Sequence, residues 1–281
     1  MRKFLSIYFL IPLSALSQST SFDFHSPANI KKFADHLFCE SDYLRAAEQY
    51  ELIGNNLSND TITFKRMICY SNLELYQQSN NIFTELSDRS KFFNYAYLLS
   101  LKNNLLIKPQ PLITSKVVVL DSLHFQNLNK LITISMLYDP QFDIAKEEFL
   151  SSFDFSEQNT VSLFYDYKVE PPYKSSALAG ILSAVIPGSG KMYVGEWGDG
   201  ITAFLVTGLL AFLAYDNFRA DHSTRAWIFT GLGAFFYAGN IYGSIASAQI
   251  FNARIDFEFN DGLKLFLEKK NYFLPEYDFC K

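Results

Sequence analysis

The sequence predicts an all-α protein built from two unlike parts. An exported helical-repeat domain is followed by a Gly-rich transmembrane helical hairpin with a short or re-entrant first helix. Three observations predict this fold class: an export-signal pattern at the start, aromatic and small residues that recur at a near-constant step, and charge-free apolar runs after residue 175. The net charge is −5 and the chain has no Lys/Arg cluster, which argues against a nucleic-acid partner because phosphate binding needs clustered cations.

The first residues have the pattern of a secretory signal. Two basic residues precede an apolar core at 4–16, and Ala15 and Ser17 form a small-x-small cleavage pattern. The sequence therefore predicts a signal peptide over 1–17. An uncleaved anchor is the alternative, but the apolar core is shorter than the about 20 residues that cross a bilayer.

A repeated pattern fills 18–150. An aromatic residue, a small residue three positions later and a second aromatic one helical turn beyond occur twice, 33 residues apart, and again 66 residues further on. The intermediate set at Pro109, Leu112 and Lys116 matches poorly but keeps the phase. The pattern resembles the tetratricopeptide repeat, whose period is about 34 residues and whose helix pairs stack through apolar faces. A generic helical bundle is the alternative. The repeat-packing residues are Tyr43, Ala46, Tyr50, Tyr76, Ser79, Phe83, Phe142, Ala145 and Phe149. The first helices of the pairs are expected at about 29–39, 63–72, 92–102 and 128–137.

Cysteine usage sets limits on redox chemistry. Export places the repeat domain in an oxidising compartment, and with three cysteines at least one lacks an intramolecular partner. In the repeat register Cys39 and Cys69 fall on adjacent first helices. A disulfide between them is one hypothesis, and two buried free thiols are the alternative. No C-x-x-C pair exists, which disfavours zinc and thioredoxin-type chemistry.

A linker is predicted over 151–174, as a last packing helix or strand followed by an extended connector. Two prolines, Pro171 and Pro172, prevent any helix from continuing through it. Tyr173 and Lys174 suit the membrane–water interface, where amphipathic rings and long cations are favoured.

The predicted membrane unit covers 175–252 and holds three charge-free runs, at 175–190, 200–215 and 226–253. The third is long enough to cross a bilayer and the second is slightly short. A Pro-Gly-Ser-Gly turn interrupts the first, which favours a short or re-entrant helix over a full span. The tail at 253–281 fits either a helix continuing from the membrane, which we favour, or a hairpin turning at Asn260-Asp261-Gly262.

Small residues in the third run predict close helix packing. Gly239, Gly243 and Ser247 stand at four-residue spacing, a small-xxx-small face whose helix partner is the second run or another copy of the chain. Asn240 and Gln249 are strongly polar side chains within this run, and we expect them to form interhelical hydrogen bonds.

The turn motif carries the most specific resemblance. Its residues are Pro187, Gly188, Gly190, Tyr193 and Gly195. This region is similar to small two-span membrane families with a Pro-Gly-x-Gly-x-x-Tyr-x-Gly signature. Behind a tetratricopeptide-like half, it resembles uncharacterised envelope proteins of the Bacteroidota. The resemblance implies architecture and location, and no enzymatic activity.

Other site chemistry is disfavoured. Gly188-Ser189-Gly190-Lys191 looks like part of a phosphate-binding loop, but Val185 and Met192 stand where that loop needs Gly and Ser/Thr. The histidines His25, His36, His124 and His222 lack metal-ligand spacing. The sequence thus predicts no catalytic, cofactor-binding or metal site.

The sequence predicts a non-enzymatic protein of the bacterial inner membrane. Its periplasmic N-terminal domain would bind a protein partner, and its hairpin would lie in the lipid bilayer. The alternative is an oligomeric membrane-active component, such as a channel, transporter accessory or insertion factor, built on the hairpin. Arg219 and Arg225 place the 216–225 loop in the cytoplasm under the positive-inside rule. Two full spans then return the tail to the periplasm, whereas three would leave it in the cytoplasm.

Overall fold

The structure is a computed structural model that describes residues 25–53, 59–113, 120–269 and 277–280. Within these residues the chain is helical and has no β-strand, which confirms the all-α prediction. The predicted signal peptide at 1–17 lies outside the described residues. The chain forms two compact units, unit 1 (Met1–Ser90 with Phe279–Lys281) and unit 2 (Lys91–Asp278).

This division differs from the predicted one, which placed all of 18–150 in a single repeat domain. The helices after residue 90 belong to unit 2 because α5 and α8 pack against the long last helix of the chain.

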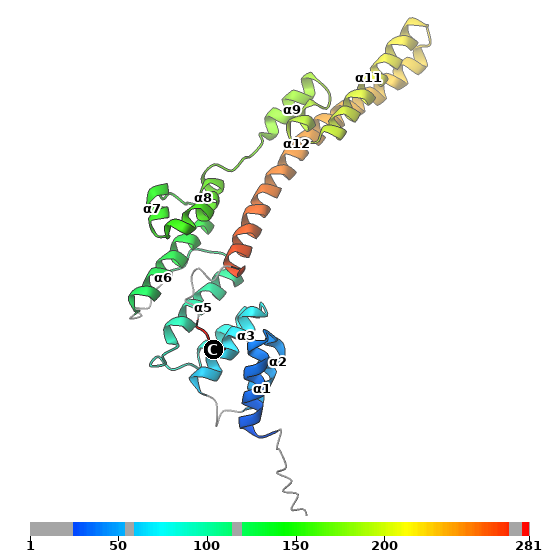
Figure 1. Ribbon diagram of the computed structural model, residues 1–281. Helices are drawn as coiled ribbons and strands as arrows, with labels where there is room; N and C mark the ends of the chain where they lie inside the picture. Colours follow the sequence, from blue (N-terminus) through cyan, green and yellow to red (C-terminus); the bar gives the residue numbers. More distant parts are fainter. Residues whose placement is uncertain (1–24, 54–58, 114–119, 270–276, 281) are drawn as a thin grey trace, which may run out of the picture. The chain divides into compact units, whose positions relative to one another are not determined.

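Unit 1 contains two consecutive helix pairs (Figure 1). The helices are α1 (Pro27–Cys39), α2 (Tyr43–Leu52), α3 (Asp60–Asn72) and α4 (Tyr76–Phe83). Pro27 begins α1, where its fixed φ suits the first helical position. Asp42 and Asn59 cap α2 and α3 by accepting hydrogen bonds from Arg45 N and Ile62 N. The helix α2 also packs against α3, so the two pairs are stacked.

The turns inside these pairs explain a departure from the tetratricopeptide pattern. That pattern has Gly before the aromatic residue, and this chain has none there. Ser41 follows α1 with φ of 61° and Glu74 follows α3 with φ of 60°. Both adopt the left-handed conformation that Gly adopts without steric cost. The tight turn therefore forms without its usual residue, at the cost of local strain.

The first part of unit 2 is a set of shorter helices. These are α5 (Phe93–Ile107), α6 (Ser122–Ser135), the 3-10 turn η1 (Met136–Tyr138), α7 (Lys146–Ser151) and α8 (Phe155–Val169). Asp154 and Glu157 form a capping box that begins α8. This helix occupies most of the predicted linker and ends at Val169, just before Pro171 and Pro172, so the "last packing helix" interpretation is confirmed.

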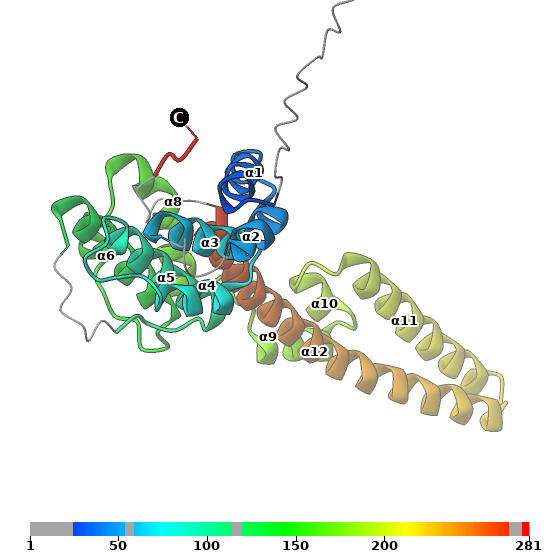
Figure 2. The same ribbon diagram turned by 90° about the horizontal axis from the view of Figure 1, so that it is seen from below.

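The second part of unit 2 contains the apolar helices: α9 (Ser176–Val185), α10 (Ser189–Tyr193), α11 (Trp197–Arg219) and α12 (Ser223–Lys269). In Figures 1 and 2, α11 and α12 lie side by side, joined by a short turn, and α9 lies along α12. The helix α12 continues through Asn260, Asp261 and Gly262 without a break. The helical interpretation of the tail is therefore confirmed as far as Lys269, and the hairpin alternative is wrong.

Among the described residues, one helix is long and apolar enough to cross a membrane, namely α11, with 23 residues and a mean hydropathy of 1.5 in its most apolar stretch. From the sequence we expect the same of the 226–253 run in α12. That run contains no charged residue, but its glycines, tyrosines and Asn240 lower its mean hydropathy.

Candidate functional site in the apolar helices

The Pro-Gly turn separates α9 from α10 by a sharp change of backbone conformation. Ile186, which precedes Pro187, is extended with φ of −131° and ψ of 110°. Proline disfavours helical angles in the residue before it, so α9 ends there. Gly188 then adopts φ of 87°, a left-handed conformation that a side chain would strain.

Two glycines of this turn allow backbones to approach closely. A Cβ on Gly188 would lie 1.9 Å from the carbonyl oxygen of Gly200, and one on Gly190 would lie 1.9 Å from that of Ala179. No side chain fits either space. The motif glycines therefore hold the turn against the start of α11 and against α9.

A buried serine holds the turn to α12. Ser183 Oγ on α9 accepts a hydrogen bond of 2.9 Å from Gly190 N. It also lies 2.6 Å from Ser244 Oγ on α12, which donates to the Asn240 carbonyl at 2.9 Å. Both serine side chains are fully buried. This chain of hydrogen bonds satisfies polar groups that would otherwise be stranded among apolar side chains.

Both ends of the α9–α10 segment meet the same part of α12. At the start, Lys174 N donates to Asn252 Oδ1 at 2.8 Å, and Asn252 Nδ2 donates to Lys174 O at 2.9 Å. At the other end, Ser247 Oγ donates to Glu196 Oε2 at 2.7 Å. Asn252 and Ser247 are little more than one helical turn apart. The segment therefore advances along α12 and returns to nearly the level at which it began.

A groove of about 450 Å³ lies beside this segment. Its lining residues on α11 extend over positions 199–207, which at 1.5 Å per residue is about 12 Å. One end is polar and the rest is mainly apolar. The lining residues are Lys191, Asp199, Thr202, Ala203, Val206, Thr207, Phe235, Phe236, Gly239 and Asn240.

Asn240 is the unusual residue of the groove. Its side chain is 7% exposed, and neither its amide nitrogen nor its amide oxygen has a hydrogen-bond partner among the described residues. A buried polar group left unpaired costs about 1–3 kcal/mol. From the sequence we expect Asn240 to form an interhelical hydrogen bond, and within the described residues its amide forms none. Gln249, the other polar residue of that expectation, is exposed.

Opposite charges stand at the polar end of the groove. Lys191 Nζ lies 3.9 Å from Asp199 Oδ2, at the outer limit of an ion pair, and the side chains are 22% and 71% exposed. A contact of this length between partly solvated groups contributes little to stability. Both charges are therefore available to a ligand.

The remaining motif residues have separate positions. Tyr193 OH accepts a hydrogen bond from Ser175 N at 3.3 Å, and its ring lies under Lys174 Nζ. Gly195 has φ of 94° and open space around it. The motif residues Pro187, Gly188, Gly190 and Tyr193 thus belong to one packed turn. Gly195 makes no such contact, and its role is to adopt a left-handed backbone conformation.

Within the described part of the chain, Gly239 and Gly243 of the predicted small-xxx-small face do not pack closely against the second run. A Cβ on Gly239 would meet no atom within 4 Å, and one on Gly243 would meet the Lys191 side chain. Ser247 is buried and bonds Glu196. The close backbone approach is made instead by Gly188 and Gly190, because the short α9–α10 turn must fit against its neighbours.

The first two sets of repeat-packing residues lie between paired helices. Ala46 and Tyr50 are buried in the core of unit 1, against which Tyr43 packs half-buried. Ser79 is fully buried and donates to Met67 O at 2.8 Å, while Tyr76 and Phe83 are half-buried at the two ends of α4.

The third set does not form a helix crossing. Ala145 is exposed and precedes the first residue of α7, and Phe142 lies in the non-helical stretch before it. Phe149 is fully buried, and its ring and that of Phe142 pack with Tyr165 of α8. Helical spacing does not apply here because α7 begins only at Lys146. Positions 109–113 of the intermediate set are not helical either.

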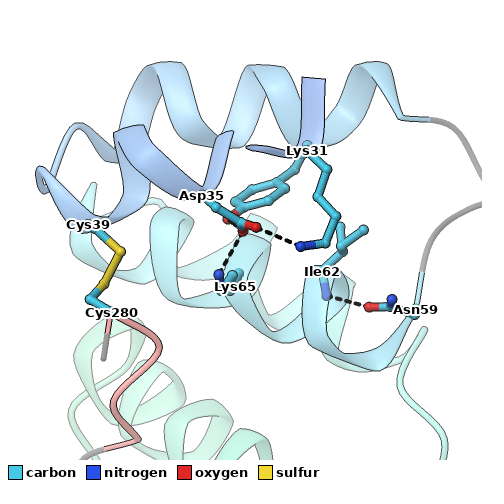
Figure 3. A network of polar contacts seen from close by, with 8 residues as sticks. Lys31, Asp35, Cys39, Asn59, Ile62, Lys65 and Cys280 are labelled. Carbon is cyan, nitrogen blue, oxygen red and sulfur yellow. Dashed lines mark hydrogen bonds and ion pairs between the residues drawn. A yellow bond between two sulfur atoms is a disulfide. The ribbon is translucent and has the colours of Figure 1, made fainter. Parts of the chain in front are cut away.

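The cysteines pair differently from the hypothesis. Cys39 forms a disulfide with Cys280, 241 positions away (Figure 3). Cys69 is a buried free thiol. Burial raises the pKa of Cys69 to about 12. Sequence spacing carries no signal for a pair as distant as Cys39 and Cys280, so the sequence alone assigns Cys280 no partner.

Aromatic and charged groups hold the C-terminal residues beside this disulfide. The Phe279 ring packs against Phe38 and Phe64, and Lys65 Nζ lies 4.9 Å from its centroid. Asp35 accepts hydrogen bonds from Lys65, Lys31 and Tyr50 at 2.6–2.7 Å, two of which Figure 3 shows. Burial opposes ionisation of Asp35, but these three donors outweigh it and lower the pKa of the carboxyl.

In the described part of the chain, no group of three or more His, Cys, Asp or Glu side chains is arranged to hold a metal ion. Comparison with protein-family models, curated proteins and solved structures found no match for this chain. The candidate site therefore depends on its own geometry, which is that of an amphiphilic groove.

Proposed function

We propose that this chain is an inner-membrane-anchored envelope protein. Helices α11 and α12 cross the bilayer, and the helical domain outside it binds a protein partner. The exposure of α11 carries the proposal, since only 11% of its most apolar stretch is buried. A soluble core helix buries its apolar side chains, whereas a helix in lipid leaves them on its surface.

The α9–α10 segment completes the anchor as a re-entrant element. A helix of ten residues is about 15 Å long, half of the about 30 Å hydrocarbon core. Because Lys174 and Glu196 both bond α12 near one level, the segment enters and leaves on the same side. Its broken backbone is satisfied by Ser183 and by close packing, as non-helical backbone inside a membrane requires.

Two crossings put the domain before α9 and the residues after α12 in the same compartment. The Cys39–Cys280 disulfide supports this arrangement because a covalent bond cannot join opposite sides of a membrane. It also favours an oxidising compartment, in agreement with the export-signal pattern.

Three exposed apolar side chains on unit 1 are the proposed contacts for the protein partner. Phe33, Leu44 and Leu52 are 49%, 54% and 65% exposed, and none belongs to the buried core. Exposed apolar side chains of this kind contribute to binding when a partner removes them from water.

Affinity purification of the full chain from cross-linked membranes tests the proposal. We expect an exported protein to co-purify at constant stoichiometry, and a Phe33→Ser/Leu44→Ser variant to lose it. The matched control, Lys32→Ser/Glu48→Ser, alters exposed polar residues of the same helices and should retain the partner. A homo-oligomer without an exported partner that conducts ions in liposomes would instead support the membrane-active alternative.

A further inference from the structure

We propose that the groove between α10, α11 and α12 binds one zwitterionic glycerophospholipid with a primary-amine headgroup. The lipid phosphate meets Lys191, the headgroup ammonium meets Asp199, and an ester carbonyl bonds Asn240. The inference rests on the proposed function because a lipid ligand requires that α11 and α12 lie in a membrane.

The charges at the mouth select the headgroup. Lys191 and Asp199 stand 3.9 Å apart and together are neutral. A purely anionic ligand would leave Asp199 unmatched, and a purely cationic one would leave Lys191 unmatched. A phosphate and an ammonium joined by a short linker match both, and a primary ammonium also donates hydrogen bonds to the carboxylate.

The body of the groove suits an acyl chain. Beyond the mouth it is lined by Val206, Phe235 and Phe236, and both phenylalanines are exposed. Its volume of about 450 Å³ falls within the about 300–1,000 Å³ of small-molecule sites. Gly239 leaves open space at the groove wall, where a side chain would narrow it.

Asn240 lies between the charged mouth of the groove and its apolar body. Its amide is buried and lacks a partner in the described part of the chain, and Asn240 lines the groove together with Lys191 and Asp199. In a glycerophospholipid the ester carbonyls lie between the phosphate and the acyl chains. A bound lipid therefore places an acceptor near the amide at the depth where one is missing.

A second copy of the chain fits the same groove less well. Its apolar runs at 200–215 and 226–253 carry no charged side chain and so supply no partner for Lys191 or Asp199. A dimer formed through this groove is one of the outcomes that the experiment below distinguishes.

Native mass spectrometry of the full chain, purified in mild detergent, tests the inference. The protein is offered equimolar phosphatidylethanolamine, phosphatidylcholine and phosphatidylglycerol with identical acyl chains. We expect phosphatidylethanolamine to be retained about tenfold better than the other two, the effect of one charge-assisted hydrogen bond.

Three variants separate the contacts. Asn240→Leu should weaken retention of all three lipids by about tenfold, since all have ester carbonyls. Lys191→Gln should also weaken all three, through the phosphate. Asp199→Asn should abolish only the preference for phosphatidylethanolamine. The matched controls are Gln249→Leu and Asp216→Asn, exposed residues on α12 and α11 that do not line the groove.

Equal retention of the three lipids, or wild-type retention by Asn240→Leu, would overturn the inference. So would a dimer that excludes lipid and dissociates in Asn240→Leu. Carbonate extraction of the same membranes keeps the two proposals apart. A chain that resists extraction but shows no lipid preference contradicts only the lipid site, whereas a chain that is extracted contradicts the membrane anchor itself.

Discussion

At the scale of single residues, two polar side chains on neighbouring helices have opposite environments. Ser183 is fully buried, and its hydroxyl joins Gly190 N to Ser244. Asn240 lies one turn from Ser244 and has no partner for its amide in the described residues. The hydrogen bonds of Ser183 hold the Pro-Gly turn in place. The amide of Asn240 is left without a hydrogen-bond partner at the groove.

We expect Gly190→Ala to destabilise the membrane part of unit 2. The new Cβ would lie 1.9 Å from the Ala179 carbonyl oxygen and 2.7 Å from Ser183 Oγ, so the turn must move. Overpacking of this kind costs about 1–3 kcal/mol. Gly208→Ala is the matched control because its Cβ meets no atom within 4 Å, and alanine favours a helix. Thermal unfolding in detergent compares them, and equal midpoints would contradict the close contact.

Sequence reasoning at this scale identified motif residues better than it identified their partners. Pro187, Gly188 and Gly190 were singled out correctly as a turn because proline and glycine act on the backbone locally. Their contacts with Gly200 and Ala179 depend on how helices pack, which a single sequence does not encode. The same holds for Cys280 and for Asn240.

At the scale of helices, α12 connects the apolar helices with the rest of unit 2. Its 47 residues span about 70 Å, more than twice the about 30 Å hydrocarbon core. In the proposed arrangement its second half therefore lies outside the membrane. There it packs against α5 and α8, and Phe164 of α8 contacts Phe259 and Phe266.

The α5–α12 contact contains a lysine whose charge opposes folding. Lys102 is 5% exposed, and burial lowers its pKa from 10.5 to about 8, although Glu268 partly offsets this. Between pH 8 and 10.5 the unfolded chain binds more protons at this residue than the folded one does. Its contribution to stability therefore rises with pH across that window, by up to about 1.4 kcal/mol per pH unit.

We expect Lys102→Met to be more stable than wild type below pH 8 and to lose this advantage towards pH 10.5. Lys108→Met is the control, since Lys108 is exposed at the end of the same helix. Thermal midpoints of the three proteins at pH 7, 8.5 and 10 provide the measurement. A constant difference between Lys102→Met and wild type at all three pH values would show that the lysine is not buried.

The step of the aromatic and small-residue pattern placed the first helices of the early pairs correctly. The expected first helices at 29–39 and 63–72 correspond closely to α1 and α3, and the continuation of α12 was favoured correctly. The pattern at 142–149 was misleading because aromatic spacing alone does not show where a helix begins. Phe142 lies before the first turn of α7, so its cluster with Tyr165 forms by tertiary packing.

At the scale of the whole molecule, the chain leaves unit 1, forms unit 2, and returns to unit 1 at Phe279. The disulfide closes this path between Cys39 and Cys280. The sequence favours a two-span topology because the Pro-Gly-Ser-Gly turn interrupts the first apolar run, and the disulfide supports this topology by an independent physical argument.

We expect non-reducing electrophoresis of the exported chain to show a faster-migrating form that slows on reduction. Cys39→Ser and Cys280→Ser should each abolish it, and the double variant should equal either single one. Cys69→Ser should keep it, because Cys69 is a free thiol. Alkylation at pH 8 should leave native Cys69 unmodified, since its raised pKa keeps it protonated. A Cys39–Cys69 bond found by peptide mapping would contradict this pairing.

The span of that disulfide also imposes an order on biosynthesis. Cys39 emerges early, but its partner is made 241 residues later, after both long apolar helices. The thiol of Cys39 must therefore stay reduced, or be held by an oxidoreductase, until the intervening segments have been inserted and residue 280 has crossed. In the proposed topology a chain in which only one of the two spans has inserted leaves its two cysteines on opposite sides and never closes. The bond then distinguishes correctly inserted molecules from misinserted ones, and an unpaired Cys39 is a chemical mark by which quality control can recognise the latter.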